Sequence, residues 1–174
     1  MINITALRKN YILQIPATLI VLVLMWGLPI LFHASPGPEG LPIGARLLPI
    51  YYAPLLAVSL FNPIVPLASS LIMPFINHSL TGMPAMNIAA LLSVELTVFS
   101  LVLIYARNKG MKQPAIAPLA VMIGKAVSAC VLFALPLVPG SPVEYFTSSV
   151  TTALPGILVI LVLQIALSYL PNEH

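Results

Sequence analysis

The chain has 174 residues, of which 60% are hydrophobic and only 6% are charged, with four Glu and no Asp. A soluble domain carries roughly a quarter charged residues, because its surface has to be solvated. The composition therefore excludes a soluble enzyme and a disordered chain. A net charge of +3 is also too small for a nucleic-acid-binding face. The class that it predicts is an all-α, polytopic membrane protein in the lipid bilayer, with a single domain over residues 1–174.

Six apolar segments follow one another along the chain, bounded by Pro, Gly, Asn or charged residues. At about 1.5 Å of rise per residue, the first and the last three are long enough for a bilayer core of about 30 Å. The second and third are short and meet at Asn62-Pro63, a sequence typical of a turn. The predicted spans are residues 12–32, 47–61, 64–77, 87–106, 116–138 and 149–170.

The alternative to six spans is one kinked helix over residues 47–77, which gives five. Arg8 and Lys9 precede the first span, and three further cations lie in the connection 106–115. Only six spans place both basic groups on the same side of the membrane, and the positive-inside tendency makes that side the cytoplasm. The sequence therefore predicts a six-transmembrane-helix bundle with both termini cytoplasmic.

Two charges fall within predicted spans, Glu95 in the fourth and Lys125 in the fifth. A charge at this depth costs at least about 2.5–3.5 kcal/mol, so such groups usually pair or face a cavity. Counting the rise per residue from the two membrane edges places both within roughly 5 Å of the same level. We expect an ion pair between antiparallel neighbours, acting as a structural lock, as the floor of a polar cavity, or as both.

Further polar and aromatic residues gather at the predicted outer side of the bundle. They occur early in the second span, in the loop after the third span, at the start of the fourth span and in the last outer loop. Together with the two buried charges they predict an outward-facing cavity with convergent polar groups. The predicted substrate-binding residues are Tyr51, Tyr52, His78, Thr81, Asn87, Glu95, Lys125 and Tyr145.

The sequence contains no recognisable catalytic or metal-binding pattern. The HExxH, GxSxG and P-loop motifs are absent, and the three histidines lack the spacing of metal ligands. We therefore expect a protein that is not an enzyme and that holds no metal or cofactor. Without a nucleotide-binding motif, the chain cannot energise transport by itself.

Several segments share a recognisable pattern, of which Leu80-Thr81-Gly82-Met83-Pro84 is the most specific. Looser matches lie in residues 46–57, 74–79, 94–96, 123–125 and 152–157. Taken in chain order, these segments resemble the substrate-binding S components of energy-coupling-factor (ECF) vitamin transporters. The resemblance implies a six-helix protein of the bacterial cytoplasmic membrane that binds a vitamin or cofactor precursor near the outer surface. It also implies docking on a transmembrane coupling protein with two ATPase subunits, which supply the energy.

The same resemblance suggests which solutes the protein binds. Family members commonly carry His where Tyr52 stands and Arg where Lys125 stands, and both departures bear on the solute. A cobalamin-type corrinoid, with His78 as a cobalt ligand, is slightly preferred, and pantothenate or another small acid would suit Lys125. The alternative to a transporter is a non-transport assembly or structural subunit in which the pair of Glu95 and Lys125 is purely structural.

Docking on the standard module is left open by the first span. Many members carry Ala-x-x-x-Ala there, and such small residues allow close approach of a partner helix. In this chain Ala17 is followed four residues later by Val21. Small residues at that spacing occur instead in two other pairs. These are Ala53 with Ala57, and Gly124 with Ser128.

Overall fold

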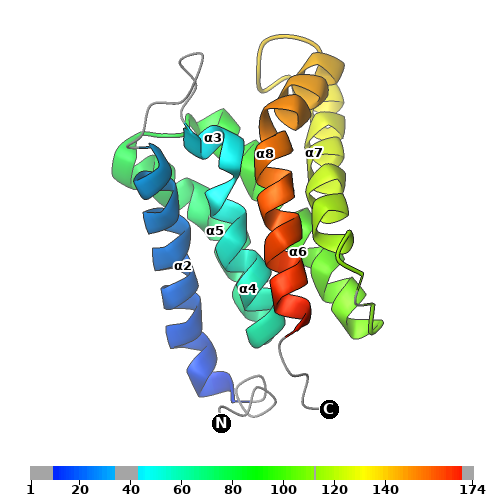
Figure 1. The fold of residues 1–174 in the computed structure, drawn as a ribbon. Coiled ribbons are helices and arrows are strands. Elements are labelled where there is room, and N and C mark those ends of the chain that lie inside the picture. Colours follow the sequence, from blue (N-terminus) through cyan, green and yellow to red (C-terminus); the bar gives the residue numbers. More distant parts are fainter. Residues whose placement is uncertain (1–9, 34–42, 112, 170–174) are drawn as a thin grey trace.

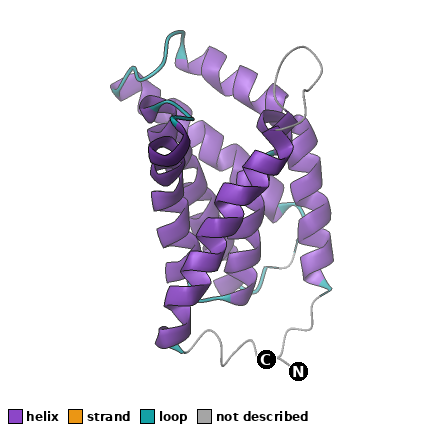
Figure 2. Cartoon of the chain, turned by 90° about the vertical axis from the view of Figure 1, so that its left-hand side faces the viewer, coloured by secondary structure: helices purple, strands orange, loops and turns teal. Residues whose placement is uncertain are grey.

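The computed structural model describes residues 10–33, 43–111 and 113–169, and within these ranges every regular element is a helix (Figure 2). In chain order they are α2 (Tyr11–His33), α3 (Ile43–Leu47), the 3-10 helix η2 (Pro49–Tyr51), α4 (Tyr52–Leu60), α5 (Ile64–Thr81), α6 (Met86–Asn108), α7 (Ile116–Ala134) and α8 (Pro142–Ser168). The predicted all-α class is confirmed for the described residues.

The long helices lie side by side and alternate in direction between two ends of the molecule (Figure 1). The lower end in that view holds the start of α2, the end of α4, the connection from α6 to α7 and the end of α8. The upper end holds α3 and the connections from α5 to α6 and from α7 to α8. Helix α6 packs against α4, α5 and α7, which explains why it contributes many of the buried residues.

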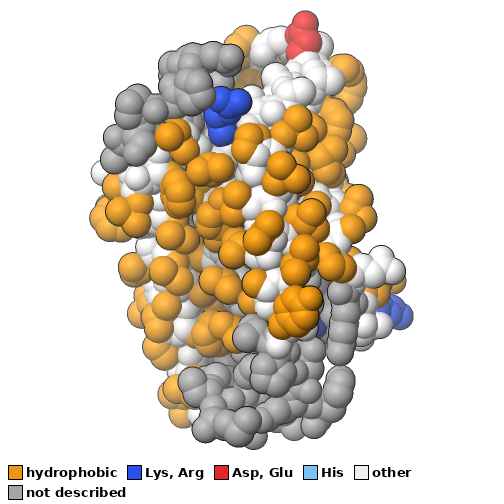
Figure 3. All heavy atoms as spheres, viewed as in Figure 1, with side chains coloured by type: hydrophobic (Ala, Val, Ile, Leu, Met, Phe, Trp, Pro, Cys, Tyr) orange, Lys and Arg blue, Asp and Glu red, His pale blue; other side chains and the backbone are white. Residues whose placement is uncertain are grey.

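Five helices, α2, α5, α6, α7 and α8, are long and apolar enough to cross a membrane. In Figure 3 hydrophobic side chains cover the middle of the visible face, and the charged side chains that can be seen lie towards the ends. Ile12 and Leu31 of α2 are 81% and 71% exposed. Such a large apolar surface would be unfavourable in water. These features are consistent with a multi-pass membrane protein.

The predicted second span, residues 47–61, is not one continuous helix. Leu48 has a left-handed backbone with φ 55°, which interrupts the helical geometry between α3 and η2. The apolar helical stretch that follows, Pro49–Leu60, is shorter than the five long helices. A turn at Asn62-Pro63 then separates α4 from α5, so the alternative of one kinked helix over residues 47–77 is wrong. Six membrane crossings stay a prediction.

Helix α5 extends beyond the predicted end at residue 77 and continues to Thr81. Gly82 ends it with a left-handed backbone (φ 71°), and its N–H donates to His78 O at 2.8 Å. Glycine suits this position because it lacks the Cβ that disfavours a positive φ. The predicted loop at His78 and Thr81 is therefore the last turn of a helix.

Helix α8 begins at Pro142 rather than at the predicted residue 149. Ser141 caps it, because its Oγ accepts from the Glu144 N–H at 3.1 Å while the Glu144 carboxylate accepts from the Ser141 N–H at 2.9 Å. This reciprocal capping box is a strong helix start. The prediction that Tyr145 lies in a loop is wrong, and its side chain is fixed instead by the first turn of α8.

Small residues bring helix backbones into contact inside the bundle. A Cβ on Gly124 would lie 2.7 Å from the Glu95 carbonyl oxygen, so α7 approaches α6 closely at this level. Ser128, one turn further along α7, is fully buried, as is Ala57 of α4. Ala53 is 1% exposed. Neither predicted small-residue pair forms an outward docking face, because both pack within the bundle.

Candidate ligand-binding cavity

A cavity of about 570 Å³ lies among helices that come from the whole length of the chain. Its walls are mainly apolar and include Trp26 of α2 together with Ile88 and Leu92 of α6. Its polar lining residues are Tyr51, Asn77, Thr81, Glu95, Lys125 and Tyr145. A mainly apolar cavity of this size with a few polar groups is typical of small-molecule sites.

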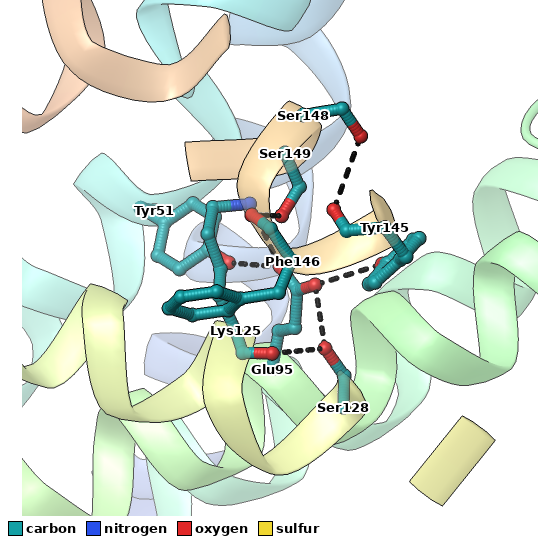
Figure 4. A network of polar contacts seen from close by, with 8 residues as sticks. All are labelled: Tyr51, Glu95, Lys125, Ser128, Tyr145, Phe146, Ser148 and Ser149. Atoms are coloured by element: carbon teal, nitrogen blue, oxygen red, sulfur yellow. Dashed lines mark hydrogen bonds and ion pairs between the residues drawn. The ribbon is translucent and has the colours of Figure 1, made fainter. Parts of the chain in front are cut away.

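The Glu95 carboxylate is the centre of a buried polar network (Figure 4). Its Oε2 accepts from the Tyr51 hydroxyl at 2.8 Å and from Lys125 Nζ at 3.3 Å. Its Oε1 accepts from the hydroxyls of Ser128 at 2.8 Å and Tyr145 at 2.9 Å. The predicted ion pair is thus confirmed, and the four donors together satisfy the buried carboxylate.

The Lys125 ammonium is less completely satisfied than its partner. Its side chain is 7% exposed, and Glu95 is its one hydrogen-bond partner among the described residues. An ammonium group has three N–H donors. Two donors therefore remain for whatever occupies the cavity that Lys125 lines.

Local structure explains how side chains from three elements, η2, α7 and α8, reach the one carboxylate on α6. Gly124 lets α7 approach the backbone of α6 at Glu95. Lys125 and Ser128 are three residues apart on α7 and therefore share a helix face. Tyr51 is fully buried at the end of η2, and its ring packs edge-on against Phe99 with a centroid distance of 5.1 Å. The network is therefore held by packing as well as by hydrogen bonds.

Asn77 of α5 is a polar lining residue that the sequence reasoning did not include in the site. It is 9% exposed and lines the cavity. Its backbone carbonyl accepts from the Thr81 hydroxyl at 2.8 Å, but within the described ranges its side-chain amide has no protein partner. The amide atoms are not among the fully buried side-chain atoms that lack a partner, so they are accessible from the cavity and suited to bind a ligand.

The structure brings five of the eight predicted residues together around the cavity, namely Tyr51, Thr81, Glu95, Lys125 and Tyr145. The other three do not line it and bond instead to backbone carbonyls. The Tyr52 hydroxyl donates to Leu47 O, and the Asn87 amide donates to Leu137 O. His78 Nδ1 pairs with Pro84 O at 2.9 Å. These three side chains therefore fix turns and helix ends. That the five lining residues bind a solute stays a prediction.

Cobalt ligation by His78 stays a prediction, and the position of the residue does not favour it. The residue is absent from the cavity lining, and its Nδ1 is engaged with the backbone. In the part of the chain that the structure describes, no group of three or more His, Cys, Asp or Glu is placed to hold a metal ion.

Comparison with known proteins adds no relative. No family model, curated protein or solved structure matches the chain.

Proposed function

We propose that the chain is the membrane-embedded substrate-binding component of an uptake system for a small water-soluble vitamin or cofactor precursor. The observation that carries this proposal is the cavity, which combines apolar walls with a buried ion pair and with unfilled hydrogen-bonding groups on Lys125 and Asn77. The polar groups would orient the solute, and the apolar walls would remove its surface from water.

The positions of the family-like segments support the same function. The run Leu80–Pro84 contributes Thr81, Met83 and Pro84 to the cavity, and the segment 46–57 contributes Tyr51. Glu95 and Lys125 come from two further segments. Segments that are far apart in the chain thus meet at one cavity. This convergence is expected if the resemblance reflects a shared binding site.

The proposed system includes an ECF energising module of one coupling protein and two ATPases, because the chain carries no nucleotide motif of its own. In the proposed topology the lower end of the bundle faces the bacterial cytoplasm and the cavity end faces outward. The short stretch Pro49–Leu60 serves as a sixth crossing. A test is to mix the purified chain with a purified ECF module in detergent. Co-elution supports the module, whereas separate elution supports a solitary component.

Cavity size favours the smaller of the two solutes considered. About 570 Å³ is within the range of roughly 300–1,000 Å³ for drug-sized ligands. A complete corrinoid with its nucleotide loop is considerably larger than such ligands. We therefore propose a single-ring or short-chain vitamin or precursor as the solute, and the corrinoid becomes the less suitable candidate.

One observation favours a second candidate, a membrane subunit in which the ion pair is only structural. The Glu95 carboxylate already accepts from four protein donors, so the network locks α6, α7 and α8 without any solute. The two candidates differ at Asn77, which adds nothing to this lock. A structural subunit does not require its unpartnered amide, whereas a binding component does.

The deciding experiment combines mass spectrometry of copurified small molecules with thermal unfolding of the protein in detergent against a vitamin panel. A bound ligand at one hundred times its Kd adds about 2.7 kcal/mol of stability. A solute that raises the Tm and is recovered chemically unchanged supports a binder rather than an enzyme. No copurified molecule and no change in Tm across the panel would favour the structural subunit.

A further inference from the structure

The cavity has no excess charge. Glu95 is the one acid and Lys125 the one base among its described lining residues, and their charged atoms lie 3.3 Å apart. The sum of the two charges is zero whichever group holds the proton. Both side chains are buried, with 3% and 7% exposure. A solute that enters this cavity therefore meets a neutral site that contains a strong internal dipole.

This neutrality disfavours an ionised solute. The attraction of a carboxylate to Lys125 is opposed by repulsion from Glu95, whose Oε2 lies 3.3 Å from the ammonium nitrogen. The same opposition, with signs reversed, applies to a cation. An ion that moves from water into a site without a net counter-charge loses its hydration energy, and attraction to the site replaces little of it. The pair therefore compensates itself and leaves no charge for the solute.

Hydrogen-bonding capacity is nevertheless available to a neutral solute. Lys125 has two N–H donors without acceptors among the described residues. The Asn77 amide, 9% exposed in the cavity lining, offers both a donor and an acceptor. An amide or lactam edge presents the complementary donor and acceptor to Asn77, and a carbonyl oxygen is a suitable acceptor for an ammonium donor.

We propose that the cavity selects a neutral solute whose polar part is an amide, a lactam or another uncharged carbonyl group, and that it discriminates against the matching acid. This inference rests on the proposed binding function and names the chemical class of its substrate. It also replaces the expectation that Lys125 recognises a small acid, because Lys125 is already neutralised by Glu95.

The test uses matched pairs that differ in charge. Nicotinamide is compared with nicotinate, pantothenol with pantothenate, and biotinamide with biotin, by thermal unfolding of the full chain in detergent. The expected result is that at least one neutral compound raises the Tm. Its acid should need a concentration about tenfold higher or more for the same shift, which corresponds to about 1.4 kcal/mol.

The possible failures are distinguishable. An acid that binds as tightly as its neutral partner, or more tightly, overturns the neutral-solute inference and leaves the binding function standing. If none of the six compounds shifts the Tm and no small molecule copurifies, the binding function is overturned, and the inference is overturned with it.

Variants test the two groups that carry the inference. Glu95→Gln leaves the Lys125 charge uncompensated, so the preference should shift towards the acid by about tenfold or more. Where this variant does not fold, Asn77→Leu gives an independent test, because it keeps the branched shape of the side chain and replaces the amide oxygen and nitrogen with methyl groups. It should weaken binding of the neutral compound by about tenfold or more, and unchanged binding would overturn the role of Asn77.

Thr97→Val is the matched control for these variants. Thr97 Oγ1 is buried without a hydrogen-bond partner among the described residues, and Thr97 is absent from the cavity lining. Its replacement by the isosteric valine should leave the preference between the paired compounds unchanged. A preference altered equally by Thr97→Val and Asn77→Leu would show a general packing effect and overturn the assignment.

Discussion

The two ends of the bundle use polar side chains differently. At the lower end, the Arg107 guanidinium donates to Val58 O and Phe61 O where α4 ends. Gln14 accepts from the Asn62 N–H at 3.2 Å and donates to Asn10 O at 2.9 Å. In the upper half, Lys125 and Asn77 line the cavity instead, with hydrogen-bonding groups that no described residue satisfies.

This difference separates polar groups that hold the fold from those available to a ligand. Backbone carbonyls at a helix end need donors wherever water is scarce, and Arg107 meets that need at the end of α4. Glu95 is likewise satisfied by protein donors. Burial and charge therefore do not by themselves identify a binding residue. The distinguishing feature is hydrogen-bonding capacity left open towards a cavity.

The largest expected effect is at the ion pair. Lys125→Met leaves the Glu95 carboxylate buried without a counter-charge and should reduce the free energy of unfolding by about 3–5 kcal/mol. Unfolding in detergent, followed by circular dichroism, measures the change. The double variant Glu95→Gln with Lys125→Met should recover most of the loss, because it contains no buried charge. A single variant as stable as the natural chain would contradict the structural importance of the pair.

The second largest effect is expected from a substitution at the lower end of the bundle, away from the cavity. Arg107→Met removes the charged donor from the carbonyls of Val58 in α4 and of Phe61 just after it and should lower the free energy of unfolding by about 1.5–3 kcal/mol. Lys109→Met is the control. Lys109 is exposed, with Nζ 5.8 Å from the Tyr105 ring centroid, and its loss should cost about 0.5–1 kcal/mol at most. Equal losses, or a selective loss of ligand binding in Arg107→Met, would contradict the separation of the two ends.

A third substitution tests the close contact between α7 and α6 next to the network. Gly124→Ala places a Cβ 2.7 Å from the Glu95 carbonyl oxygen, so α7 must move away from α6. The free energy of unfolding should fall by about 1–3 kcal/mol, and ligand binding should weaken as Lys125 is displaced. Gly27→Ala is the control, because its Cβ would meet nothing within 4 Å. If both variants behave alike, the close approach at Gly124 is not required.

The smallest effect is the loss of one donor from the network. Tyr145→Phe removes the hydroxyl that donates to Glu95 Oε1 at 2.9 Å, and the cost should be about 0.5–1.5 kcal/mol because three other donors remain. Tyr169→Phe, at a residue 81% exposed, should leave stability unchanged. Thermal unfolding of the two variants side by side checks this, and a loss above that of Lys125→Met would reverse the assigned order.

The buried pair was predictable from the sequence because depth in a membrane follows from counting residues. Glu95 and Lys125 lie in long, uninterrupted apolar helices, so the rise per residue fixes their level. The donor Ser128 could have been found by the same reasoning, since it follows Lys125 by three positions on the same helix face. Asn77 also carried a signal, as a polar residue between Ile76 and the predicted loop.

Other parts depended on interactions that the sequence pattern does not show. Polar side chains of the kind found in binding sites can instead bond to backbone carbonyls, as those of Tyr52, His78 and Asn87 do. Such partners depend on tertiary placement and not on residue type. Helix ends were misplaced for a similar reason, because apolar content alone does not reveal that the Ser141 capping box starts α8 before its apolar stretch.

The cap at Ser141 also decides that Tyr145 belongs to helix α8. Tyr145 follows directly after Glu144, the residue that completes the capping box, so its direction is that of the helix as a whole. A helix that began only at residue 149, where the predicted span starts, would leave Tyr145 in a loop without that fixed direction. Two hydrogen bonds at an exposed helix terminus thus keep one donor of the buried network in place.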